Sequence, residues 1–177
     1  MKKTGIIIFL ILLFIIIYLL QANLFSWFNI TGVKPNLFVI LTLIIGLFAG
    51  RKLGIAFGIF FGLIIDFLIN KSIGIASIML GLTGIIGGYL DKNFSKDSRI
   101  TMITMIVITT LIYELGTIIL NLFINDSKIV IWYVLKNLII ELIYNSIITI
   151  IIYPIIIKFG YILEETFKTN KIMTRYY

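Results

Sequence analysis

The chain contains no cysteine and no histidine among its 177 residues. Without cysteine it can form no disulfide framework and no thiolate metal site. Without histidine it has no imidazole ligand and no Ser-His or Cys-His catalytic arrangement. These two absences remove most metal-dependent and hydrolytic mechanisms, so we expect a protein that is not an enzyme and that uses no cofactor.

Charged residues are also scarce, and apolar residues are abundant. Charged residues make up 13% of the chain and hydrophobic residues 60%, with a mean hydropathy of +1.14. Soluble domains have only about 45 to 50% apolar residues. The net charge is +7, but the basic residues are scattered between apolar segments instead of forming one basic face. The composition therefore predicts an all-α polytopic protein of the lipid bilayer, with no nucleic-acid partner.

The apolar sequence falls into segments that have the length of membrane spans. We expect one transmembrane domain of six helices over residues 1–157, followed by a basic, amphipathic tail over 158–177 along the inner membrane surface. The alternative for this tail is a frayed extension of the sixth helix. The second segment has only 13 residues, about 20 Å at ~1.5 Å per residue, so it can also be re-entrant in a core about 30 Å thick. The segments are Ile6–Leu20, Leu37–Ala49, Leu53–Ile69, Ile73–Leu90, Ile100–Ile124 and Leu138–Ile157.

Lysine and arginine positions favour six crossings over five. Basic residues concentrate in cytoplasmic loops. Six spans with both termini inside place 11 basic residues in the cytoplasm and 4 outside, whereas a second segment that fails to cross gives 5 and 10. The chain is thus predicted to be a multi-pass protein of the cytoplasmic membrane, with both termini inside. The inner residues are Lys2, Lys3, Arg51, Lys52, Lys92, Lys96, Arg99, Lys158, Lys168, Lys171 and Arg175, and the outer ones are Lys34, Lys71, Lys128 and Lys136.

The amino terminus shares the charge pattern of a signal peptide, because Lys2 and Lys3 precede an apolar run. The run ends in Leu20, Gln21 and Ala22, which lack the pair of small residues that a signal peptidase needs. We therefore expect the segment to be retained as the first helix.

Glycine recurs at every fourth position through the second and third segments. Residues four apart share one face of a helix, and glycine there lets another backbone approach closely. We predict close packing between the third and fourth segments; the alternative is an interface with a partner protein. The glycines of this prediction are Gly46, Gly50, Gly54, Gly58 and Gly62, with Gly81, Gly84 and Gly88 in the fourth segment.

The charged and amide side chains that stand out within the spans share the outer half of the membrane in the predicted topology. They can form a buried network or line a cavity open to the outside. Snorkelling to the interface is a second explanation for Lys136 and Glu141. Asp66 and Glu114 have either a structural partner or a contact with another subunit or ligand, and no nucleophile accompanies them for acid–base catalysis. The set is Asp66, Glu114, Lys136, Glu141 and Asn145.

The order of these motifs resembles the family of rod shape-determining proteins called MreD. The first motifs are Lys34-Pro35-Asn36, an apolar run, Gly50, Gly54, Gly58 and Gly62-Leu63-Ile64-Ile65-Asp66. The later motifs are Gly74, Gly81, Gly88-Tyr89-Leu90, Tyr144-Asn145-Ser146 and Tyr153-Pro154. Asn36 departs from the pattern, which commonly has aspartate there. The resemblance implies a non-enzymatic subunit of the cell-elongation machinery that binds an MreC-like bitopic protein. Through this partner it would act with the MreB-like filament and with the peptidoglycan synthases, a SEDS glycosyltransferase and a penicillin-binding transpeptidase.

A second hypothesis follows from the fold that the resemblance implies. That fold is similar to the substrate-binding subunits of energy-coupling-factor vitamin transporters, which also have about six helices. The outer polar residues suit a small polar ligand. However, such subunits commonly present small residues on their first helix to the coupling partner, and Ile6–Leu20 has none. Vitamin binding is therefore the alternative function.

Overall fold

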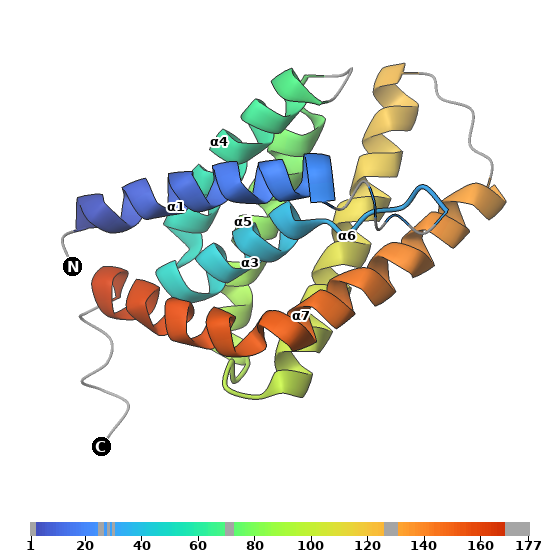
Figure 1. The fold of residues 1–177 in the computed structure, drawn as a ribbon. Helices are drawn as coiled ribbons and strands as arrows, with labels where there is room; N and C mark the ends of the chain where they lie inside the picture. Colours follow the sequence, from blue (N-terminus) through green and yellow to red (C-terminus); the bar gives the residue numbers. More distant parts are fainter. Residues whose placement is uncertain are drawn as a thin grey trace.

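The structure is a computed structural model that describes residues 3–24, 27, 29, 31–69, 73–125 and 131–168, without the side chains of residues 24 and 125. Its helices form a single bundle (Figure 1), and these ranges contain no β-strand, which confirms the all-α prediction. The elements are α1 (Lys3–Leu19), a π-helical turn (Leu20–Leu24), α3 (Leu37–Ala49), α4 (Arg51–Leu68), α5 (Ile75–Asn93), α6 (Arg99–Asn125) and α7 (Ile131–Phe167).

Within the described residues, three stretches are long and apolar enough to cross a bilayer. They are Lys3–Asn23, Arg99–Ile124 and Ile131–Phe167. The predicted six helices are present, and crossing of the membrane by all six stays a prediction.

Helix α3 forms the centre of the bundle. Every residue from Leu37 to Ala49 is buried, which suits a sequence that is apolar on all sides. Helices α4, α5, α6 and α7 all contact α3. Its surroundings are therefore largely protein, so its length of 13 residues need not match the thickness of the lipid core.

Helices α4 and α5 make the most extensive contact in the bundle, and both pack on α3. Gly50 joins α3 to α4 with a φ of 97°, a left-handed backbone conformation that L side chains rarely adopt. Helix α1 is peripheral. Its buried residues are Ile6, Leu10 and Phe14 alone, as expected for a helix whose other faces meet lipid.

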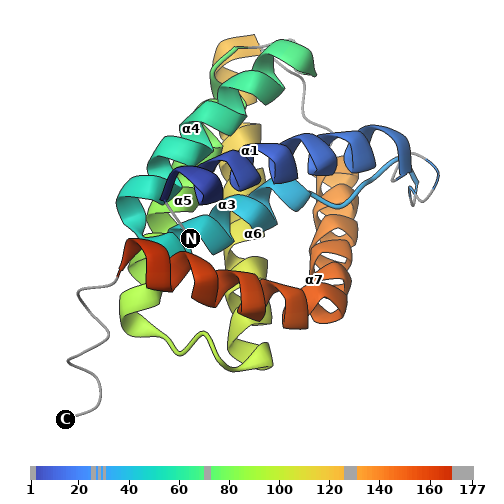
Figure 2. The same cartoon turned by 60° about the vertical axis from the view of Figure 1, so that its left-hand side comes forward.

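Helix α7 continues without a break past residue 157, where the sequence suggested that the last span ends. It changes direction along its length (Figure 2), and Pro154 lies within it. Proline removes one backbone hydrogen bond and thereby favours a bend. The start of α1 and the end of α7 come to lie on the same side (Figure 1), and the rings of Phe9 and Phe159 are 5.4 Å apart.

Candidate functional site

Glycines of α3, α4 and α5 allow three backbones to meet. A Cβ atom added to Gly46 would lie 2.5 Å from the carbonyl oxygen of Gly84, and one added to Gly54 would lie 2.7 Å from the same oxygen. Side chains essentially never approach backbone that closely. Gly87 and Gly88 of α5 are equally restricted, by the backbone of Leu43 and Arg51. These positions accept only glycine unless a helix moves.

The same seam continues along α4 toward its end. Added Cβ atoms on Gly58 and Gly62 would collide with the α5 backbone at Leu80 and Ser77. The Ser77 hydroxyl also donates a hydrogen bond across the interface. We call the seven glycines of this interface the glycine seam: Gly46, Gly54, Gly58, Gly62, Gly84, Gly87 and Gly88.

Two predicted packing glycines have other roles. Gly50 is the left-handed link between α3 and α4, and a Cβ atom there would meet only Lys168 Cε at 3.7 Å. Gly81 faces the side chain of Ile59, 3.0 Å from an added Cβ atom, instead of a backbone. The glycine repeat therefore contains one linker and one looser contact.

Asp66 caps a neighbouring helix. Its carboxylate accepts hydrogen bonds from the backbone N–H groups of Gly74, Ala76 and Ser77, at 2.9, 3.1 and 3.0 Å. These groups belong to the first turn of α5, where helices leave backbone donors without an internal partner and favour negative charge. Asp66 is only 1% exposed. The structure thus gives this carboxylate an internal structural partner.

A second set of polar side chains joins α6 to α7. Asn145 Nδ2 donates to Thr110 Oγ1 at 3.1 Å, and both residues are fully buried. One helical turn along, the carboxyl groups of Glu114 and Glu141 lie in hydrogen-bonding contact. Thr117 follows Glu114 by about one helical turn, so it lies next along the same face of α6.

On α7 the same face carries Asn137, Glu141 and Asn145, four residues apart. We call the combined set the polar seam: Thr110, Glu114 and Thr117 of α6 with Asn137, Glu141 and Asn145 of α7. Lys136, although predicted with this group, has its side chain on the exposed surface of α7. The structure therefore brings Glu114, Glu141 and Asn145 together and leaves Lys136 and the capping Asp66 out.

Asn36 connects the polar seam to α3. Its backbone N–H donates to Asn145 Oδ1 at 2.8 Å, and its own Oδ1 accepts from Val39 N at 3.3 Å as the cap of α3. Its side chain also contacts the Tyr113 hydroxyl and Glu141. A neutral amide serves all these contacts, so the aspartate expected by the family pattern is not required for them.

The comparison with known proteins covers almost the whole bundle. The family described as rod shape-determining protein MreD matches residues 1–162. The chain belongs to the MreD family. The match begins at the first helix, whereas the sequence motifs began only near Lys34, and it supports a role in determining rod shape. No curated protein and no solved structure matches the chain.

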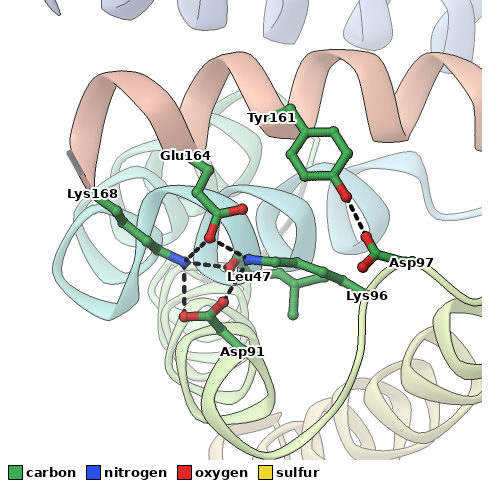
Figure 3. A network of polar contacts seen from close by, with 7 residues as sticks. All are labelled: Leu47, Asp91, Lys96, Asp97, Tyr161, Glu164 and Lys168. Atoms are coloured by element: carbon green, nitrogen blue, oxygen red, sulfur yellow. Dashed lines mark hydrogen bonds and ion pairs between the residues drawn. The ribbon is translucent and has the colours of Figure 1, made fainter. Parts of the chain in front are cut away.

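This MreD chain carries a charge cluster that the sequence motifs did not indicate. Lys96, in the loop after α5, lies 2.7 Å from Asp91 Oδ1 and 2.7 Å from Glu164 Oε1. Lys168, just after α7, lies 2.8 Å from Asp91 Oδ2. Figure 3 shows the four side chains pointing toward one another from α5, its following loop and α7. We call Asp91, Lys96, Glu164 and Lys168 the charge cluster.

The charge cluster lies at the end of α3. Lys168 Nζ donates to the carbonyl oxygen of Leu47 at 2.8 Å, and Lys96 Nζ lies 4.9 Å from the centre of the Phe48 ring. The last carbonyls of a helix favour cations, and an aromatic face also attracts them. Both lysines therefore hold the end of the central helix.

Burial and pairing act in opposite directions on the charge cluster. Burial tends to raise the pKa of Asp91, but hydrogen bonds and charges of Lys168 and Lys96 outweigh it, so this pKa lies below its ordinary value. Burial lowers the pKa of Lys168 despite its bond to Asp91. The net effect keeps Asp91 ionised.

Proposed function

We propose that this chain is a non-enzymatic integral membrane subunit of the bacterial cell-elongation complex. It binds an MreC-like bitopic membrane protein and helps to regulate peptidoglycan synthesis and cell shape. The observation that carries the proposal is the MreD family match over residues 1–162. MreB-like filaments and the peptidoglycan synthases are engaged indirectly, through the MreC-like protein.

The arrangement of the polar groups supports a structural and regulatory role over catalysis. Asp66 is engaged by backbone N–H groups of α5, and the charge cluster holds α7 against α3 and α5. Within the described residues, no group of three or more Asp, Glu, His or Cys side chains is arranged to hold a metal ion. The helices would then act as a rigid platform for a membrane partner.

The proposed topology has six crossings with both termini in the cytoplasm. The basic-residue distribution supports it. The fold also supports it, because the start of α1 and the end of α7 lie on the same side of the bundle (Figure 1). An even number of crossings returns the chain to the side on which it started. In this arrangement the charge cluster faces the cytoplasm. The first residues of the predicted tail over 158–177 form the last turns of α7.

Depletion of the chain in its native rod-shaped bacterium tests the proposal. We expect cells to widen and round as the protein is lost, while re-expression of the wild-type chain restores the original width. Cell width and the sites of new wall insertion are measured by fluorescence microscopy. Depleted cells that keep both their width and their insertion pattern would contradict a role in elongation.

A further inference from the structure

Buried oxygen atoms without partners gather in the polar seam. Among the described residues, six buried side-chain atoms have no hydrogen-bond partner, and three of them are Thr117 Oγ1, Asn137 Oδ1 and Glu141 Oε1. Buried polar atoms without a partner cost free energy, so such a concentration calls for an explanation. Glu141 is only 9% exposed, and its carboxyl group contacts Glu114 and the side chain of Asn36.

These three atoms lie on one stretch of the α6–α7 interface. Asn137 lies one turn from Glu141 on α7, and Thr117 lies one turn from Glu114 on α6. Because Glu114 meets Glu141 across antiparallel helices, the same register places Thr117 level with Asn137. The residues that carry the unpartnered oxygens therefore lie at neighbouring levels of the α6–α7 interface, beside the two carboxyl groups.

The groups around the carboxyl pair supply no compensating positive charge. Helix α3 has no charged residue, and from α6 the neighbouring titratable group is the Tyr113 hydroxyl. On α7 the nearest cation in sequence is Lys136, whose side chain is exposed. Asp66 of α4 is another acid. No lysine or arginine is among the side chains that act on the carboxyl groups of Glu114 and Glu141.

Two carboxyl groups in contact inside a membrane protein cannot both be ionised without a positive charge between them, because like charges repel strongly at low dielectric. Carboxylate, amide and hydroxyl oxygens are also the ligands that hard cations prefer. We infer that Glu114 and Glu141, with the oxygens of Thr117 and Asn137, form a binding site for one monovalent cation, either a proton or Na⁺. Its occupancy holds α6 against α7.

Carbodiimide labelling of the purified full-length protein tests this site. Dicyclohexylcarbodiimide reacts with protonated carboxyl groups in apolar surroundings, and peptide mass spectrometry locates the adduct. The reaction is followed over a pH series in choline chloride and in sodium chloride. We expect an adduct on Glu114 or Glu141 that decreases as the pH rises.

The two salts distinguish the two cations. Protection by sodium chloride, at least threefold relative to choline chloride, identifies Na⁺ as an occupant. Equal labelling in the two salts identifies the proton alone. Absence of an adduct on both glutamates at every pH, with and without Na⁺, would overturn the proposal.

Melting temperature in detergent supplies a second readout. In choline chloride the wild-type melting temperature should fall as the pH rises, since loss of the proton leaves two carboxylates in contact. Glu114→Gln keeps the shape and removes one charge, so its melting temperature should change less with pH. Glu165→Gln, a change at an exposed position of α7, should behave as the wild type. Identical pH dependence in Glu114→Gln and the wild type would contradict the site.

Discussion

Lys96 Nζ lies 2.7 Å from Glu164 Oε1, although 68 residues separate the two in the chain. Lys96 is 5% exposed and lies in the loop that joins α5 to α6, whereas Glu164 lies in the last turns of α7. The contact ties the end of α7 to the bundle on the far side of Pro154. The last turns of α7, up to Phe167, are therefore held against the rest of the bundle.

Lys96→Met should release the end of α7. The change leaves Asp91 and Glu164 with only Lys168 as a cation, and a buried group that loses its partner costs about 1 to 3 kcal/mol. We expect faster hydrogen exchange across residues 158–167. Lys92→Met, at an exposed position on α5, is the matched control. Equal exchange in the two variants would show that the charge cluster does not hold this helix.

The glycine seam should tolerate no larger side chain. Gly62→Leu and Gly84→Leu force α4 and α5 apart, and overpacking costs about 1 to 3 kcal/mol even where the surroundings can adjust. Both variants should accumulate less folded protein in the membrane and melt at lower temperature. Gly5→Leu adds the same side chain where no atom lies within 4 Å, and it should leave both quantities unchanged. Wild-type abundance of both seam variants would show that the helices do not depend on this contact.

Asp66→Asn should weaken the α4–α5 pair even without a partner protein. An amide keeps one acceptor oxygen, but its NH₂ group is a donor. It would face backbone N–H groups that now donate hydrogen bonds to the carboxylate, so these bonds would be lost. We expect a lower melting temperature of the isolated protein in detergent, with Glu165→Gln as the control. A variant with unchanged melting temperature but reduced recovery of a partner would instead indicate that Asp66 acts at an interface.

Single cysteines test the six-crossing topology, since the chain has none of its own. Ser95→Cys, in the loop after α5, should react with maleimide only after the membrane is permeabilised. Ile73→Cys replaces a side chain that is 64% exposed at the opposite end of α5, and it should react in intact cells. Labelling of Ser95→Cys by an impermeant maleimide in intact cells would exclude the proposed orientation.

Much of the fold follows from the sequence because it depends on local pattern. The second apolar segment and α3 have identical bounds, Leu37–Ala49, because the apolar run is flanked by Asn36, the N-cap, and Gly50, the C-cap. The four-residue glycine repeat includes Gly54, Gly58 and Gly62, which lie at the α4–α5 contact. It could not show that Gly50 is a linker, because spacing alone does not reveal a left-handed φ.

Contacts between distant segments could not be predicted in this way. Lys96 meets Glu164 only because α7 continues past Pro154 and turns toward α3, and the apolar pattern predicted that the span ends near residue 157. The polar seam was partly visible in the sequence, because Glu114, Glu141 and Asn145 were all in the predicted intramembrane polar set. Thr110 and Thr117 were missed, although their spacing from Glu114 places all three on one face of α6.

Co-purification from native membranes tests the central claim most directly. The chain, tagged and expressed from its own promoter, is extracted in mild detergent, and both its protein partners and its small molecules are identified by mass spectrometry. We predict recovery of a bitopic MreC-like protein at a stoichiometric level and no saturable vitamin binding. Recovery of a bound vitamin without such a protein would contradict the proposed function and would favour a substrate-binding subunit of a transporter.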